Sequence, residues 1–170
     1  MGSKKDWEES LDSLFLSYFR QSRLLHLLGV GNSIRRDDGV GLFIAAQLIK
    51  KYGTRPNKKT RIHPASNSLE SLLSRLSETG DRVLLFDSVE NKSEPGSIIL
   101  AGLDDTRFGF FATHNIPLRL IPNITENMSN LHVLGVEPET VEIGEGLSDS
   151  VRKSALQIVS KIGALVVRGG

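Results

Sequence analysis

The sequence predicts an α/β domain of three layers, built on a five-stranded, mostly parallel (mixed) twisted sheet with helices on both faces. Short apolar runs that end at Gly, Pro or polar residues alternate with longer segments whose apolar residues recur at helical spacing. This alternation is typical of βαβ units, in which helices cover a parallel sheet. One connection between two runs is too short for a helix, which adds an antiparallel strand.

Short apolar runs that end at turn signals predict the strands. The first run stops at Gly29 and Gly31, and the third stops on a carboxylate, Asp87. The third and fourth runs are separated by a short turn that contains Pro95-Gly96, so we expect them to pair as a hairpin. The predicted strands are residues 23–30, 59–63, 82–87, 97–101 and 131–136.

Helical periodicity and end signals predict the helices. The first helix after the first strand ends in Lys50 and Lys51, with Gly53 beyond, which are helix stop signals. The next two helices each begin after a polar residue that can act as the N-cap. This residue is Asn67 or Ser68 for one helix and Ser148 or Asp149 for the other. The predicted helices are residues 39–51, 67–78 and 148–166, and residues 115–122 are weakly helical.

An amphipathic helix over residues 5–20 precedes the first strand. Its apolar face comprises Trp7, Leu11, Leu14, Phe15, Tyr18 and Phe19. We expect it to pack on the domain; docking of a partner or self-association is the alternative. The chain therefore divides into an N-terminal helical extension, residues 1–22, and an α/β domain, residues 23–170.

Composition excludes several classes of function. The 170 residues carry 21 Lys and Arg against 20 Asp and Glu, and only 6% are aromatic, which argues against a nucleic-acid binder. The absence of Cys excludes disulfides, a thiolate nucleophile, Cys-ligated zinc and iron–sulfur clusters. No signal peptide and no apolar run of the ~20 residues that a membrane helix needs are visible. We expect a soluble cytoplasmic protein without a membrane partner.

The segment after the first strand begins like a dinucleotide-binding loop but does not continue as one. The third position after Gly31 is Ile34, where the glycine fingerprint requires Gly. Asp37 and Asp38 also stand where a helix N-terminus would hold a phosphate, so we argue against nucleotide binding. Asp37 is interpreted as the helix N-cap, which leaves Asp38 for solvent or for a ligand.

Two further polar positions are predicted at the same edge of the sheet. Asp87 directly follows four apolar residues and is either a cap for a nearby loop or a site residue. His114 stands in the first turn of a weak helix, where a neutral, metal-ligating imidazole is favoured, although a lone His is more often structural. Together with Asp38 they form an O,O,N set suited to nickel, zinc or manganese. The other histidines lie in or at the end of predicted strands: His26, His63 and His132.

Several short motifs in order resemble those of the hydrogenase maturation proteases, the endopeptidases that trim the large subunit of nickel–iron hydrogenases. They cover about residues 23–165. The motifs are Gly29-Val30-Gly31-Asn32, Asp37-Asp38-Gly39-Val40-Gly41, the strand 83–87 followed by Pro95-Gly96, Thr113-His114-Asn115-Ile116-Pro117-Leu118, Leu134-Gly135-Val136-Glu137-Pro138 and Gly144-Glu145-Gly146-Leu147-Ser148.

The resemblance implies a function and a site. The metal-contacting residues of the family fall on Asp38, Asp87 and His114, where they would also serve as the catalytic residues of an aspartyl-type endopeptidase. They would contact nickel that the precursor already carries, so no tightly held metal of its own is expected. One carboxylate, or a metal-polarised water, would then activate attack on the scissile bond. The implied partner is the nickel–iron hydrogenase large-subunit precursor, and the implied oligomeric state is a monomer.

The chain departs from the family pattern away from the three expected ligands. The stretch His63-Pro64-Ala65-Ser66-Asn67-Ser68 lacks the Gly-containing turn with a Pro-Glu pair, and position 137 is Glu where Gln is common. Three other functions remain open on the sequence: a non-cleaving metal- or precursor-binding maturation factor, a nucleotide- or phosphosugar-binding enzyme, and a structural α/β domain. The paired Asp and the broken glycine fingerprint argue against the second.

Overall fold

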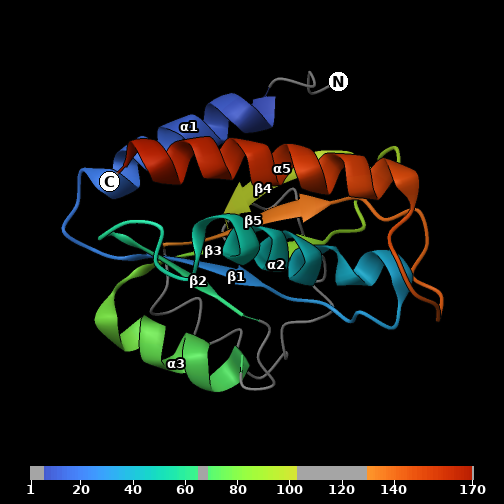
Figure 1. The fold of residues 1–170 in the computed structure, drawn as a ribbon, viewed down its shortest axis with the longest axis horizontal. Coiled ribbons are helices and arrows are strands. Elements are labelled where there is room, and N and C mark those ends of the chain that lie inside the picture. The colour runs from blue at the N-terminus through green and yellow to red at the C-terminus, as the bar shows by residue number, and fades with distance from the viewer. Residues whose placement is uncertain (1–5, 65–68, 103–129, 170) are drawn as a thin grey trace.

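The computed structural model describes residues 6–64, 69–102 and 130–169. Its centre is a five-stranded mixed sheet in the order β2-β1-β3-β5-β4. Helices lie on both faces of this sheet (Figure 1), which confirms the predicted three-layer α/β fold.

The strands lie within a residue or two of the predicted runs. β1 (Leu25–Gly29), β3 (Arg82–Ser88) and β5 (Leu131–Val136) form the parallel centre, and β2 (Thr60–His63) adds parallel to β1. β4 (Ile98–Gly102) pairs antiparallel with β5 at the edge. β3 is buried along nearly its whole length, which explains its continuous apolar run.

The predicted hairpin between the third and fourth strands is wrong, although the antiparallel strand is real. β5 lies between β3 and β4, so β4 contacts only β5. β5 is apolar on both faces and is buried at a central position, whereas β4 is half-buried and takes the edge. The connection from β3 to β4 crosses the end of β5, where Val89 N–H donates to the Val136 carbonyl and Glu137 N–H to the Ser97 carbonyl.

Two apolar cores lie on the two faces of the sheet. α2 (Val40–Tyr52) and α5 (Asp149–Arg168) cover one face. Their apolar side chains form a core with sheet residues such as Leu27 and Phe86. α3 (Leu69–Thr79) covers the other face, where Leu73 and Leu76 belong to the same buried cluster as Leu85. Side chains of alternating positions along β3 thus enter different cores.

The predicted N-terminal helix is α1 (Asp6–Phe19), and its apolar face is part of the first core. Leu11 and Phe15 are fully buried, and Trp7 and Tyr18 nearly so. The Tyr18 hydroxyl hydrogen-bonds His132 Nδ1 of β5 at 2.8 Å, and the Arg82 guanidinium lies over its ring. Burial raises the pKa of Tyr18, so this phenol stays neutral. The helix therefore packs on the domain, as expected.

None of the described helices is both long and apolar enough to cross a membrane.

Candidate functional site

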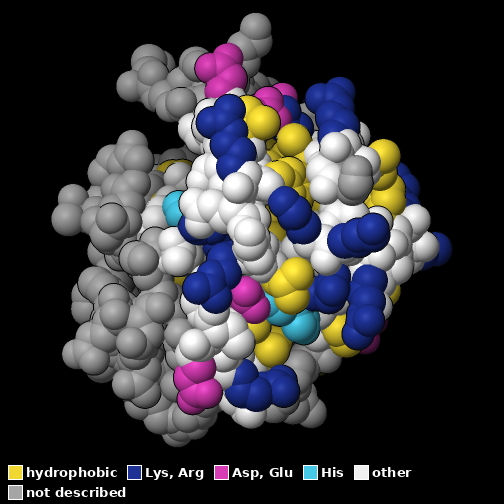
Figure 2. Space-filling view, turned by 90° about the vertical axis from the view of Figure 1, so that its left-hand side faces the viewer, with side chains coloured by type: hydrophobic (Ala, Val, Ile, Leu, Met, Phe, Trp, Pro, Cys, Tyr) yellow, Lys and Arg dark blue, Asp and Glu magenta, His cyan; other side chains and the backbone are white. Residues whose placement is uncertain are grey.

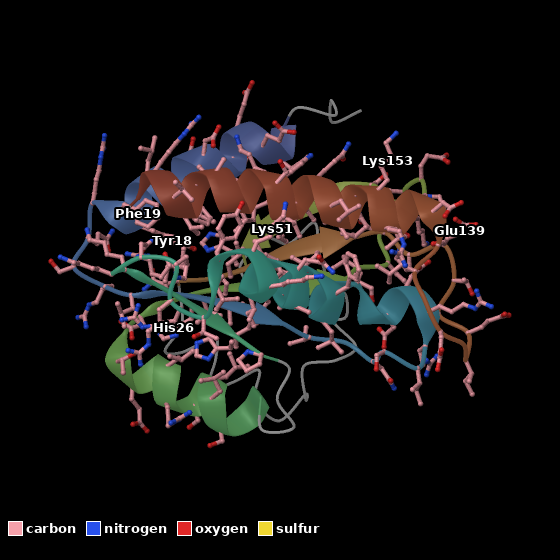
Figure 3. All side chains as sticks on the ribbon, in the orientation of Figure 1. Tyr18, Phe19, His26, Lys51, Glu139 and Lys153 are labelled. Carbon is pink, nitrogen blue, oxygen red and sulfur yellow. The ribbon has the colours of Figure 1, made fainter. Side chains whose placement is uncertain are left out.

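The candidate site lies where β1, β3 and β5 end, beside the loops 30–39 and 137–148. In Figure 3 this is the end that carries Glu139, while Tyr18 and Phe19 lie toward the other end. Ligands of open parallel sheets bind at this edge, because strand ends and loops leave polar groups exposed there. The sequence motifs around Asp38 and Asp87 both belong to it.

Asp87 is fully buried near the end of β3. Its Oδ1 accepts a hydrogen bond of 2.8 Å from the backbone N–H of Ser88. Val83, Leu85 and Val89 belong to the core beneath α3, so the alternation along the strand turns Asp87 toward that face and Ser88 toward the α2 face. The carboxylate is thus held at the strand end and not in solvent.

Asp38 reaches the same strand end from the loop after β1. It lies in the short 3-10 helix η1 (Arg36–Gly39), directly before α2, and is half-buried. Its Oδ1 accepts a hydrogen bond of 3.0 Å from the hydroxyl of Ser88, the neighbour of Asp87. The structure therefore brings two of the three predicted site residues to one strand end. A ligand that touches both carboxylates has to lie over the end of β3.

His114, the third predicted site residue, lies outside the described residues, as does the weak helix expected at 115–122. Within the described part of the chain, no three His, Asp or Glu side chains form a group that could hold a metal ion. The O,O,N set thus stays a prediction that depends on His114 for its nitrogen ligand.

Asp37 is not the N-cap of α2, contrary to the prediction. Gly39 occupies that position, and Asp37 is fully buried within η1. Its carboxylate accepts backbone N–H bonds from Glu139, Thr140 and Ser148 at 2.9, 3.1 and 2.7 Å, and a hydroxyl bond from Ser148 at 2.6 Å. Ser148, at the N-cap position of α5, therefore uses its side chain on Asp37 and not on its own helix. The first Asp of the pair joins two loops, and the second is left for the site.

Backbone hydrogen bonds extend this junction. Arg35 and Gly144 form a parallel bridge, in which Arg36 N–H donates to the Gly144 carbonyl and Gly144 N–H donates to the Ile34 carbonyl. Asp37 N–H donates to the Thr140 carbonyl, and Arg35 Nε to the Val141 carbonyl. The loops 30–39 and 137–148 are thus one structural unit behind Asp38.

The glycine-rich loop serves close packing. A Cβ at Gly31 (φ +132°) would lie 1.9 Å from the Asp38 carbonyl oxygen, because Asn32 N–H donates to that oxygen and folds the loop on itself. A Cβ at Gly41 would lie 2.0 Å from the Phe86 carbonyl oxygen, where α2 crosses β3. Both glycines therefore have a steric reason that needs no phosphate, in agreement with the broken fingerprint.

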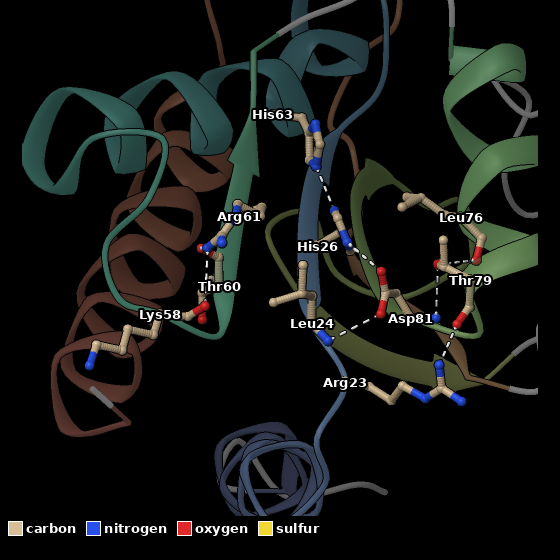
Figure 4. Close-up of polar contacts among 10 residues, drawn as sticks. All are labelled: Arg23, Leu24, His26, Lys58, Thr60, Arg61, His63, Leu76, Thr79 and Asp81. Carbon is tan, nitrogen blue, oxygen red and sulfur yellow. Dashed lines mark hydrogen bonds and ion pairs between the residues drawn. The ribbon is translucent and has the colours of Figure 1, made fainter.

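A second polar cluster lies on the α3 side of the sheet, near the amino ends of β1 and β3 (Figure 4). His26 Nδ1 and His63 Nε2 are 2.8 Å apart, and His26 Nε2 lies 3.2 Å from Asp81 Oδ2. Burial, helped by the neighbouring His26, Arg75 and Arg61, lowers the pKa of His63 to about 4. Burial also lowers the pKa of His26, against the opposing effect of Asp81. Both imidazoles are therefore neutral at pH 7.

No family model matches the chain. The Hydrogenase 3 maturation protease of Escherichia coli K12 is 26% identical over 147 residues, which cover 85% of this chain and 92% of that protein. The match therefore covers most of both chains. The chain is a homologue of the hydrogenase maturation proteases. This confirms the resemblance that the ordered motifs indicated.

Solved structures of such proteases share the fold. The hydrogenase maturation protease HycI of Thermococcus kodakarensis superposes with a TM-score of 0.69 at 22% identity, over 88% of this chain and 96% of that one. The hydrogenase maturating endopeptidase HybD of E. coli superposes with a TM-score of 0.66 at 20% identity, over 86% and 94%. The arrangement of sheet and helices is therefore that of this group of proteases.

Two features of the site of this homologue were not predicted. Ser88 ends β3 and holds Asp38, and only its place after a buried carboxylate marks it in the sequence. The four-bond role of Asp37 depends on residues more than a hundred positions away, to which no local signal points. The one sign of this role in the sequence is that two adjacent Asp residues precede a helix, although a helix start needs only one as its cap.

Proposed function

We propose that this chain is an endopeptidase that removes a C-terminal extension from the nickel-loaded large-subunit precursor of a nickel–iron hydrogenase. The observation that carries the proposal is the match to the E. coli Hydrogenase 3 maturation protease over 85% of this chain. The geometry supports it, because Asp38 is bonded to the residue beside Asp87 at the edge where α/β enzymes bind ligands.

The carboxylates are proposed to recognise the substrate by binding the nickel that it carries. Asp38 and Asp87 offer oxygen ligands and His114 an imidazole, a set that suits a borderline divalent metal. Ser88 and the buried end of β3 hold both carboxylates in place, so that their orientation does not depend on the metal. Recognition then occurs only when the precursor presents an occupied nickel site.

The proposed chemical step is hydrolysis of one peptide bond. Water adds to the scissile carbonyl, a carboxylate accepts its proton, and the leaving amine takes up a proton as the C–N bond breaks. Nickel orients the substrate, and its positive charge can polarise the attacking water or the carbonyl. The products are the mature large subunit and a short C-terminal peptide. We place the reaction in the cytoplasm and the enzyme in the monomeric state.

The test is the intact mass of a large-subunit precursor from the same genome, prepared with and without nickel and incubated with this protein. Loss of a C-terminal peptide from the nickel-loaded form alone is expected. Loss from both forms would keep the endopeptidase and remove nickel as the recognition element. No loss from a precursor shown to contain nickel would favour the non-cleaving maturation factor.

Variants test the site residues in the same assay. Asp38→Asn and His114→Ala are expected to lower the cleavage rate by at least about a hundredfold, because each removes a ligand or a proton acceptor. The matched control is Asp149→Asn, an exposed carboxylate at the start of α5. Cleavage by the two site variants at the wild-type rate would contradict the assigned roles.

A further inference from the structure

Basic side chains gather where the parallel strands begin, at the end of the molecule away from the candidate site (Figure 2). Leu25 of β1 is in register with Thr60 of β2 and with Arg82 of β3, so the starts of three neighbouring strands form one edge. In these strand starts and the connections that lead into them, Asp81 is the one carboxylate. The exposed or half-buried Lys and Arg there, which we call the basic edge, are Arg23, Arg55, Lys58, Lys59, Arg61 and Arg82.

Asp81 is bonded to groups other than these basic side chains. Its Oδ1 accepts a hydrogen bond of 3.2 Å from the Leu24 N–H, and its Oδ2 lies 3.2 Å from His26 Nε2 (Figure 4). Among the described residues, the one Lys or Arg in an ion pair is Lys161, which contacts Asp12 of α1. The basic edge therefore carries positive charge that no described carboxylate pairs with.

Hydrogen bonds to neutral oxygen atoms hold several of these cations in place. Arg23 donates to the Thr79 carbonyl at 2.6 Å, and Lys59 Nζ donates to the Phe19 carbonyl at 2.5 Å. Arg61 donates to three backbone carbonyls at the start of β2. A carbonyl fixes the position of a cation but leaves its net charge uncancelled. Less side-chain entropy is then lost when an anion binds.

Helix ends account for only part of this charge. The carbonyl end of a helix favours cations in its last turn, such as Lys51 of α2, and this effect falls off beyond that turn. Arg55 and Lys58 stand in the connection after α2, and Arg82 belongs to β3. Like charges gathered on one face repel each other, so these cations favour an anionic partner.

The chemistry of the basic edge suits carboxylates. A guanidinium offers a planar pair of donors that matches a carboxylate, and four of the six residues are Arg. Within residues 6–64, 69–102 and 130–169, every Phe, Tyr and Trp is buried or half-buried, so none is exposed for stacking on a nucleobase. Binding to a membrane surface adds large apolar side chains to a basic face, and no exposed large apolar residue lies in these strand connections.

We propose that the basic edge is a docking surface for an acidic segment of a partner protein. The segment lies across the starts of β2, β1 and β3, whose backbones are ~4.8 Å apart, so that its Asp and Glu side chains pair with cations of neighbouring strands. Docking here is independent of the proposed function, because the candidate site lies at the carboxyl ends of the same strands. The site therefore stays open while the partner is bound.

The experiment measures the Kd of a fluorescently labelled Glu-rich peptide for the full chain by fluorescence anisotropy. The same peptide with Gln at every Glu is the neutral probe and is expected not to bind. Arg23→Gln/Lys58→Gln removes two exposed cations of the basic edge and is expected to raise the Kd about fivefold. The control, Arg152→Gln/Lys153→Gln, removes the same two residue types from the start of α5 and should change the Kd by less than about twofold. Thermal unfolding of each variant shows that the fold is kept.

Binding that the edge variant weakens and the control variant does not would support the docking surface. No binding of the Glu-rich peptide by wild type, or equal weakening in both variants, would overturn it. Labelled single-stranded RNA and vesicles that contain phosphatidylserine are tested at the same ionic strength. Tighter binding of either one, weakened in the edge variant, would assign the basic edge to that partner and overturn the proposal. A concentration-dependent mass that the edge variant abolishes would assign it to a second copy of this chain, with the same consequence.

Discussion

Asp37 and Asp38 are adjacent and chemically identical, yet the structure gives them different roles. Asp37 is fully buried and accepts four hydrogen bonds, whereas Asp38 is half-buried and bonds Ser88 at the sheet edge. The 3-10 turn places consecutive side chains on different sides, one toward the loop 137–148 and one toward β3. Of two adjacent residues, Asp37 thus joins two loops, while Asp38 lies at the edge of the proposed site.

Asp37→Asn tests the structural role. The amide offers one acceptor oxygen in place of two and places an NH2 group against backbone N–H donors, so the free energy of unfolding should fall by about 2 to 4 kcal/mol. Urea denaturation measures the change. Glu142→Gln, an exposed carboxylate in the joined loop, should stay within about 0.5 kcal/mol of wild type. Equal effects of the two variants would contradict the assignment.

The imidazoles of His26 and His63 predict an acid-sensitive fold. The pKa of His63 is lowered to about 4 in the folded chain, against an ordinary value of 6.5, so the unfolded chain binds the proton more tightly. The free energy of unfolding should therefore fall as the pH drops from about 6.5 toward 4, by roughly 1 to 2 kcal/mol once solvent screening is allowed for.

His63→Gln is the matched variant, because its amide can still bond His26 but does not titrate in this range. Denaturation curves at pH 8 and pH 4.5 should show a smaller loss of stability in the variant than in wild type. Parallel losses would show that His63 does not cause the acid sensitivity.

At the scale of elements, α1 is an integral part of one core. It lies outside the α/β domain in sequence, yet Phe15 packs edge-on against Phe19 and shares a cluster with α5 and the sheet. Its outer face carries the 60% exposed Leu16. The apolar side of the helix is therefore buried against its own domain, and no partner is needed to cover that side.

Phe15→Ala and Leu16→Ala separate the two faces of α1. Loss of the buried ring should lower the free energy of unfolding by about 3 to 5 kcal/mol, since it leaves a cavity. Loss of the exposed leucine should change it by no more than about 0.5 kcal/mol. If Phe15→Ala unfolds at the wild-type denaturant concentration, α1 contributes nothing to the core.

At the scale of the whole molecule, basic residues gather at the end opposite the candidate site. Figure 2 views this end and shows many Lys and Arg side chains on it. Helix carbonyl ends meet there: Arg23 donates to the Thr79 carbonyl at the end of α3, and Lys59 Nζ to the Phe19 carbonyl at the end of α1. Cations at helix C-termini are stabilised by the partial negative charge of unpaired carbonyls. The fold thus explains a basic face that a net charge of +1 conceals.

Lys51 and Lys153 test this explanation, because Lys51 lies in the last turn of α2 and Lys153 near the start of α5. Lys51→Gln should lower the free energy of unfolding by about 0.3 to 1 kcal/mol at low ionic strength, and Lys153→Gln should leave it unchanged or raise it slightly. Added salt should remove the difference. A loss of the same size in both variants would show that the helix ends do not select these charges.

The sequence by itself determined the element types, because helices and strands are encoded in local periodicity and end signals. Lys50, Lys51 and Gly53 end α2 close to the predicted residue, and the face from Trp7 to Phe19 defines α1. The ordered motifs were also enough to indicate the family, which the match to the E. coli protease confirmed. The assignment of Asp38, Asp87 and His114 as nickel-reading residues stays a prediction.

Only the tertiary structure decided which elements and side chains meet. The two consecutive apolar strands β3 and β4 predicted a hairpin, but β5 pairs with β3 instead, because β5 can be buried on both faces. No local sequence pattern shows which of β4 and β5 will pair with β3. In the same way, the sequence predicted Asp37 as a helix cap. In the structure, its carboxylate instead accepts hydrogen bonds from Ser148, which is distant in the sequence. Local structure follows from neighbouring residues, whereas pairing and hydrogen-bond partners follow from contacts that the chain makes only when it is folded.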